Sequence, residues 1–109
     1  MFFSRTPTMS PQEIRTALGN REILLVDVRE PAEHAADRIE GAVLHPLSTF
    51  DPNALPRDAQ RPIVFHCLSG MRSAKAYKMA AKAGLPLRAH MAGGINAWKQ
   101  AGLPTVKGR

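Results

Sequence analysis

The hydrophobic residues of this chain are grouped in short runs that polar segments separate. Residues 23–28 and 62–67 form the two most apolar runs, and both are rich in branched side chains. Continuous apolar runs of this kind predict strands that are buried on both faces, as the strands of parallel sheets are. Two weaker runs, at residues 41–44 and 87–91, predict two further strands.

Helical signals lie between the expected strands. At residues 10–13, a serine that can cap, a proline at the first helical position and a glutamate three residues after the cap predict a helix. This helix should run to about Leu18 and stop at Gly19-Asn20. An alanine-rich segment predicts a longer helix that Gly84 ends. In total, the sequence predicts four helices, at residues 10–18, 31–36, 72–83 and 95–100. Residues 48–60 are expected to be a connection with one helical turn near Pro52.

The alternation of strands and helices predicts an α/β fold in which helices cover both faces of a mostly parallel sheet. A chain of 109 residues can close one hydrophobic core but not two, so we expect a single domain over residues 1–109. Residues 1–8 are expected to be a flexible N-terminal segment. In sheets of this kind ligands bind beyond the carboxyl ends of the strands, and Cys67 lies at one of those ends.

The composition is that of an ordinary globular protein, with 44% hydrophobic and 22% charged residues. No apolar run approaches the ~20 residues that a membrane-crossing helix needs. The first ten residues also lack the basic and apolar regions of a secretory signal. We therefore expect a cytoplasmic protein with no membrane partner.

The charges are distributed unevenly along the chain. Residues 59–109 hold nine basic side chains and no Asp or Glu, whereas residues 1–58 hold nine acidic and six basic side chains. The positive half contains Cys67 and favours small anions or an acidic partner protein. Nucleic-acid binding would require basic residues interleaved with aromatic ones, and this half has only three aromatic residues. We expect no nucleic-acid partner.

Cys67 is the single cysteine, so the chain has no internal disulfide, and its separated histidines predict no metal site with it. Packing or thiol chemistry remains. A strand, then Cys67, then a short loop with Gly70, then a helix can aim backbone N–H groups and the positive end of the helix dipole at the sulfur. Such surroundings lower a thiol pKa from about 8.5 to roughly 3.5–7.5. Arg72 would add a forked donor for an oxyanion.

Simpler interpretations stand beside this one. Cys67 could be a buried core residue and Gly70 a plain turn, although the order of these elements would then be a coincidence. His66 is expected to pack rather than to act as a general base, because adjacent strand residues point to opposite faces. Trp98 and Tyr77 are expected to pack. Asp27 could orient Arg29 or Arg72, accept from the loop N–H groups, or cap a helix; these alternatives stay open.

Three segments, in the right order, resemble the rhodanese family. Its active-site loop has the common form Cys-x-x-Gly-x-Arg-Ser, and the upstream and closing signatures of the family are similar to residues 25–42 and 93–104. The resemblance implies a three-layer fold with a five-stranded parallel central sheet and helices on both faces. It also implies that Cys67 shuttles between thiolate and persulfide, with no cofactor and no metal. The residues of the loop here, expected to bind substrate, are Leu68, Ser69, Gly70, Met71, Arg72 and Ser73, and Asp27 and Arg29 are expected to support them.

The loop also separates this chain from related enzymes and from other members of the family. Related phosphatases and arsenate reductases place five residues between the cysteine and the arginine, whereas residues 68–71 are four. Many members have an arginine where Leu68 stands, and Met71 adds a second apolar side chain. A persulfide on a protein or an organic thiol is therefore expected to suit this loop better than the doubly charged thiosulfate.

The function expected from these features is transfer of a sulfane sulfur, from thiosulfate or a persulfide donor, to cyanide or a thiol. Two alternatives remain. The first is a binding module of the same family that docks an acidic partner without transferring sulfur. The second is a phosphatase or an arsenate reductase, which the loop length disfavours.

Overall fold

A five-stranded sheet lies at the centre of the structure, a computed structural model that describes residues 6–107. The strands are β1 (Thr8–Met9), β2 (Leu24–Asp27), β3 (Val43–Leu44), β4 (Ile63–His66) and β5 (Leu87–Met91). The helices are α1 (Pro11–Gly19), α2 (Pro31–Ala36), α3 (Met71–Lys82) and α4 (Gly94–Gln100), with single 3-10 turns at η1 (Leu47–Thr49) and η2 (Pro52–Ala54).

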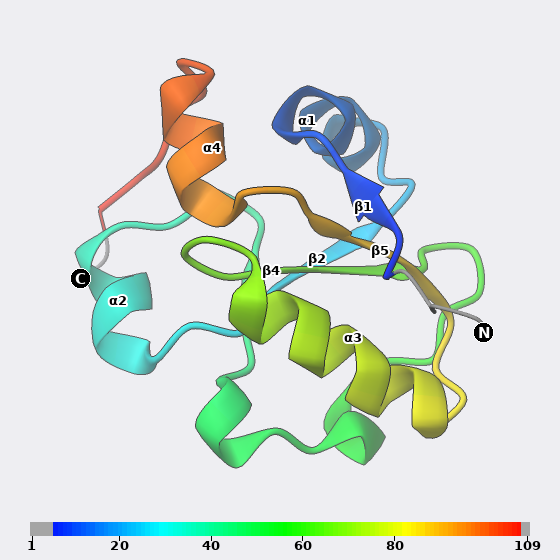
Figure 1. The fold of residues 1–109 in the computed structure, drawn as a ribbon. Helices are drawn as coiled ribbons and strands as arrows, with labels where there is room; N and C mark the ends of the chain where they lie inside the picture. The colour runs from blue at the N-terminus through cyan, green and yellow to red at the C-terminus, as the bar shows by residue number, and fades with distance from the viewer. Residues whose placement is uncertain (1–5, 108–109) are drawn as a thin grey trace, which may run out of the picture.

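The strands follow the order β1-β5-β4-β2-β3, and every neighbouring pair is parallel. Helices α1 and α4 lie on one face of this sheet and α3 lies on the other (Figure 1). The arrangement confirms the expected three-layer α/β fold. None of the helices in residues 6–107 has the length and apolar character that crossing a bilayer requires.

The helices begin and end close to the positions that local signals predict. Ser10 caps α1 reciprocally with Glu13: the Glu13 N–H donates to Ser10 Oγ at 3.1 Å, and the Ser10 N–H donates to Glu13 Oε1 at 2.8 Å. Helix α3 begins at Met71, one residue earlier than expected, and the chain leaves it through Gly84 at a φ of +75°.

The N-terminal strand differs from the sequence-based expectation. Residues 1–5 of the segment expected to be flexible lie outside the described part of the chain. Thr8 instead pairs with His90, and Met9 pairs with Met91, at the edge of the sheet. Met9 is buried in the core. This packing holds residues 8–9 against β5, whereas a two-residue strand carries no sequence pattern that would predict it.

Two clusters of buried hydrophobic residues, one on each face of the single sheet, explain why the central strands are apolar without alternation. Leu25 and Val64 belong to the cluster beneath α1 and α4, whereas Val26 and Phe65 belong to the cluster beneath α3. All four side chains have an exposed fraction of 0%. Because both faces of β2 and β4 are covered, these strands are rigidly placed, and the residues that follow them have fixed positions.

Candidate active site

The carboxyl ends of β2 and β4 lie side by side and place the candidate residues. Asp27, the last residue of β2, is paired in register with His66, the last residue of β4. The Val28 N–H extends this pairing by donating to the His66 carbonyl at 2.9 Å. Cys67 follows His66 directly, so it lies just beyond the carboxyl ends of the strands, where ligands bind in this class of fold.

The Cys67 sulfur is surrounded by donors from the loop and from the first turn of α3. The Gly70 N–H donates to Cys67 Sγ at 3.1 Å, and the Ser73 N–H donates to it at 3.3 Å. The Ser73 hydroxyl oxygen lies 3.6 Å from the sulfur. Cys67 itself is only 1% exposed. The loop therefore encloses the sulfur and turns its N–H groups inward, as the sequence predicts.

These donors favour the ionised form of the sulfur. Burial by itself raises the pKa of the Cys67 thiol, because it disfavours the charged thiolate. Hydrogen bonds from Ser73, Gly70 and Ser69 outweigh this effect and hold the pKa below its usual value. The site therefore stabilises an anionic sulfur that needs no general base.

Two glycines allow the loop to close around the sulfur. Gly70 caps α3 with a φ of +115°, a conformation that residues with a side chain rarely adopt. Gly94 lies against the other side of the loop, and a Cβ built on it would come within 2.4 Å of the Leu68 carbonyl oxygen. This close approach lets the Ile95 N–H and the Asn96 N–H, at the start of α4, donate to the Cys67 and Leu68 carbonyls at 2.9 and 3.1 Å.

Arg72 is engaged by a carboxylate. Its Nη1 and Nη2 groups donate to the two oxygens of Glu33 at 2.8 and 2.9 Å. This forked hydrogen bond lowers the pKa of Glu33 to about 2, so the carboxylate is charged at neutral pH. The guanidinium that we expected to be open to an oxyanion is thus already paired, and its charge beside the sulfur is largely balanced.

Asp27 binds Arg29 and His34, and no hydrogen bond among residues 6–107 joins its carboxylate to the loop residues 68–73. Its carboxylate accepts from the Arg29 backbone N–H at 2.9 Å, from Arg29 Nη2 at 2.8 Å and is 2.8 Å from His34 Nδ1. Arg29 Nη2 also donates to the Asp37 carbonyl at 2.7 Å. Of the alternatives left open, the structure selects the orientation of Arg29. The suggested contact with Arg72 is wrong, because Glu33 occupies that arginine.

His66 is enclosed beside this ion pair. It is fully buried, with Nε2 3.9 Å from Asp27 Oδ2 and Nδ1 3.4 Å from the Cys67 carbonyl. Burial lowers the pKa of the imidazole to about 4, so the ring is neutral at physiological pH. These contacts are those of a packed histidine and do not bring the ring to the sulfur.

The sequence analysis assigned no role in the site to two residues that contact the loop. His90 Nδ1 lies 2.8 Å from Ser73 Oγ, and Glu33 binds Arg72. His90 lies on β5 and Glu33 on α2, which are distant in sequence from the loop, and only the packing of these elements brings them there. No local pattern would have identified His90, whereas Glu33 lies within the upstream signature without a role read for it.

The outer edge of the loop is apolar. Leu68 is 41% exposed and Met71 is 83% exposed, whereas Ser73 is fully buried against the sulfur. Ser69 is exposed on the same loop. The surface above the enclosed sulfur therefore presents apolar side chains and no unpaired charge from Arg72.

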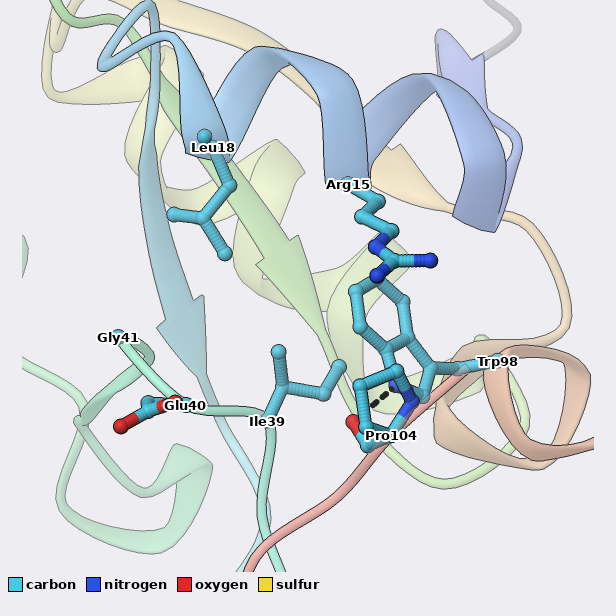
Figure 2. A pocket seen from close by; sticks show the side chains of 8 residues that line it. Arg15, Leu18, Ile39, Glu40, Gly41, Trp98 and Pro104 are labelled. Carbon is cyan, nitrogen blue, oxygen red and sulfur yellow. Dashed lines mark hydrogen bonds between the residues drawn. The ribbon is translucent and has the colours of Figure 1, made fainter. Parts of the chain in front are cut away.

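A cavity of about 400 Å³ lies elsewhere, between the end of α1, residues 39–41 and α4 (Figure 2). Trp98 and Ile39 form its apolar side, and the side chain of Arg15 extends from α1 toward the indole ring. The Trp98 Nε1–H donates to the Pro104 carbonyl at 2.8 Å, and the side chain is 3% exposed. None of the residues that line this cavity belongs to the loop around Cys67.

Among residues 6–107 no three histidine, cysteine or acidic side chains are gathered closely enough to bind a metal ion. The donors around Cys67 are backbone N–H groups and a hydroxyl, which stabilise an anion. The geometry can therefore stabilise a sulfur anion at the start of α3.

The chain is similar in sequence and in structure to proteins of one known family. A family model described as the rhodanese-like domain matches residues 10–101. An uncharacterized protein of Synechocystis sp. is 40% identical over 100 residues, which cover 92% of this chain and 56% of that protein. The chain thus spans little more than half the length of this relative.

A protein of Allochromatium vinosum named sulfurtransferase is 37% identical over 87 residues, which cover 78% of this chain and 79% of the relative. The crystal structure of a rhodanese-related protein from Thermoplasma volcanium has a TM-score of 0.81 and 26% identity. That alignment covers 92% of this chain and 97% of the other. The family model spans the loop around Cys67 and the four strands β2 to β5.

Proposed function

Because the chain belongs to the rhodanese-like domain family, we propose that it is a sulfurtransferase that carries a sulfane sulfur as a persulfide on Cys67. The observation that carries this proposal is the pair of N–H groups, from Gly70 and Ser73, that donate to Cys67 Sγ at 3.1 and 3.3 Å. A nucleophilic cysteine must be a thiolate, and this arrangement favours the thiolate.

The reaction is a double displacement. The Cys67 thiolate attacks the outer sulfur of a donor, a new S–S bond forms, and the old S–S bond breaks. The leaving group, which is a thiolate from a persulfide donor or sulfite from thiosulfate, departs with the electron pair of that bond. Cyanide or an acceptor thiolate then attacks the terminal sulfur, takes it as thiocyanate or as a new persulfide, and regenerates the Cys67 thiolate. Two half-reactions of this kind give ping-pong kinetics and require no cofactor.

We favour a persulfide on a protein or an organic thiol as the donor. Thiosulfate carries two negative charges, and the guanidinium of Arg72, the arginine of the loop, already binds Glu33 through both of its outer nitrogens. The exposed side chains of Leu68 and Met71 offer such an anion no hydrogen bond. They do offer apolar contact to a carbon chain or a protein surface. Residues 59–109 contain basic but no acidic side chains, so proteins with an acidic surface are further candidate partners.

The direct test is the intact mass of the protein after incubation with thiosulfate and, separately, with glutathione persulfide. We expect the mass to increase by one sulfur atom, cyanide to reverse the increase, and Cys67→Ser to show none. An unmodified mass with every donor would contradict the proposal. It would favour the alternative of a binding module of the same family that docks an acidic partner, because such a module needs no persulfide.

A change at Glu33 should alter the preference for the donor. Glu33→Gln keeps the size of the side chain but removes the charge that balances Arg72. We expect kcat/KM for thiosulfate to rise about fivefold, which corresponds to about 1 kcal/mol for one partly exposed charge. The value for an organic persulfide, whose two sulfur atoms carry at most one negative charge, should change less.

The matched control for this experiment is Glu40→Gln, which removes an exposed charge outside the loop. Arg72→Ala should act in the opposite direction and weaken the use of thiosulfate, which carries two negative charges, more than that of an organic persulfide. If Glu33→Gln and Glu40→Gln gave the same kcat/KM for thiosulfate, the Arg72–Glu33 pair would have no role in the choice of donor.

A further inference from the structure

A buried histidine lies one hydroxyl group away from the Cys67 sulfur, and the exchange proposed above does not use it. His90, on β5, is 8% exposed and places Nδ1 2.8 Å from Ser73 Oγ. The same hydroxyl oxygen lies 3.6 Å from Cys67 Sγ. The three side chains come from three separate elements and form one continuous chain of polar contacts.

The Ser73 hydroxyl has one hydrogen and three neighbours that could accept it. These neighbours are Cys67 Sγ, His90 Nδ1 and the Gly70 carbonyl oxygen, which lies 3.1 Å away. The Gly70 carbonyl already accepts from the Ala74 N–H at 3.1 Å within α3. A thiolate is the strongest acceptor of the three because it is charged. The direction of the His90 contact then decides whether the hydrogen is free to reach the sulfur.

The surroundings of His90 favour the neutral form of its ring. The residues paired with it in the adjacent strands are Thr8 and Phe65, neither of which carries a charge, and Ser73 faces it from α3. Burial lowers the pKa of the imidazole. A neutral imidazole has a hydrogen on one nitrogen only. If that hydrogen is on Nδ1, Ser73 Oγ accepts it and keeps its own hydrogen for the sulfur; if it is on Nε2, Nδ1 takes the Ser73 hydrogen instead.

We propose that His90 is a positioning residue whose Nδ1–H donates to Ser73 Oγ and thereby directs the Ser73 hydroxyl hydrogen to the Cys67 thiolate. The two hydrogen bonds then run in one direction: His90 donates to Ser73, and Ser73 donates to the sulfur. When the thiolate takes up a proton, the thiol S–H donates to Ser73 Oγ and the chain reverses. The ionisation of Cys67 is therefore coupled to the tautomer of a histidine that does not touch the sulfur.

This inference deepens the proposed function of Cys67, but it is tested without turnover. Because the chain has one cysteine, the ultraviolet absorbance of the thiolate as a function of pH reports the pKa of Cys67 alone. His90→Phe keeps a ring of similar size and removes both nitrogens. We expect it to raise the thiol pKa and to lower the thiolate fraction about tenfold at pH values below that pKa.

Two companion variants show whether the effect passes through Ser73. His90→Asn places an amide N–H at the position of Nδ1, so it should keep the thiolate fraction within about twofold of the wild type. In a Ser73→Ala background, His90→Phe should change the thiol pKa no further, because the intermediate hydroxyl is gone. His45→Leu, which removes a histidine distant from Ser73 in the hydrogen-bond network, controls for the titration of other rings. Far-UV circular dichroism confirms that each variant is folded, and His90→Leu replaces His90→Phe if the latter is not.

Three results would overturn the inference: an unchanged thiol pKa in folded His90→Phe, an equal change in the Ser73→Ala background, or a His90→Asn variant that behaves like His90→Phe. A failure of sulfur transfer is a separate outcome. If the thiol pKa follows the expected pattern but no donor loads the protein, the positioning role of His90 stands and the proposed sulfurtransferase activity does not.

Discussion

Replacing Asp27 with alanine is expected to lower the free energy of unfolding by about 3–5 kcal/mol, because it leaves a buried guanidinium charge without its main partner. Asp27 is 0% exposed and Arg29 is 2% exposed, and the two share hydrogen bonds of 2.8–3.1 Å. The remaining carboxylate, that of Asp37, lies 3.5 Å from Arg29 and is partly exposed. Urea unfolding followed by the fluorescence of Trp98, the single and buried tryptophan, would measure the loss.

A double variant distinguishes the cost of the unpaired charge from the loss of packing. Asp27→Ala combined with Arg29→Met removes both charges and should be more stable than Asp27→Ala alone. If the double variant lost as much stability as the sum of the two single changes, the charge would not be the cause.

The pH dependence of stability should follow from the same pair. Burial by itself raises the pKa of Asp27, but hydrogen bonds from Arg29 outweigh it and hold the pKa below its usual value. A carboxylate with a lowered pKa in the folded state contributes stability above its unfolded pKa, and this contribution is lost as the pH falls through the folded pKa. The wild type should therefore lose stability in acid more steeply than the Asp27→Ala/Arg29→Met variant.

The second large effect is expected at Gly94. Gly94→Ala should destabilise the protein by about 2–4 kcal/mol, because it combines a left-handed backbone with overpacking. The φ of Gly94 is +62°, and the new Cβ would lie 2.4 Å from the Leu68 oxygen and 2.6 Å from the Cys67 oxygen. Both atoms belong to the loop backbone, which must move. The same variant should raise the thiol pKa of Cys67, because the loop N–H groups would no longer converge on the sulfur.

Gly84→Ala is the matched control for this prediction. Gly84 has a φ of +75°, but nothing lies within 4 Å of a Cβ built on it. This variant carries only the strain of the left-handed conformation, about 1–2 kcal/mol. Equal losses of stability in the two variants would show that the contact between α4 and the loop has no energetic weight.

The sequence predicted those parts of the fold that depend on neighbouring residues. The boundaries of α1 follow from Ser10 and Glu13, which cap the helix within a single turn. The apolar runs of β2 and β4 predicted strands buried on both faces, and hydrophobic clusters on both faces of the sheet bury them. Strand β1 was missed because its two residues are held by pairing with β5, about eighty residues along the chain.

The same distinction holds for the site. The loop from Cys67 to Ser73 is contiguous, so its cradle could be expected from residue types and order alone. The partner of Arg72 is 39 residues away and the partner of Ser73 is 17 residues away. A sequence shows that a guanidinium or a hydroxyl is present, but the packing of α2 and β5 against the loop decides which side chain meets it.

The depth of Cys67 has a consequence for which chemicals can reach it. Cys67 has an exposed fraction of 1%, so the loop covers its sulfur. A molecule that reacts with the sulfur must therefore approach through a narrow terminal group. In a persulfide the outer sulfur has no substituent, so it can enter as a single terminal atom. In an ordinary disulfide both sulfur atoms carry carbon, and neither can approach without displacing the loop. This steric restriction would therefore hinder oxidised thiols from trapping the resting protein as a mixed disulfide.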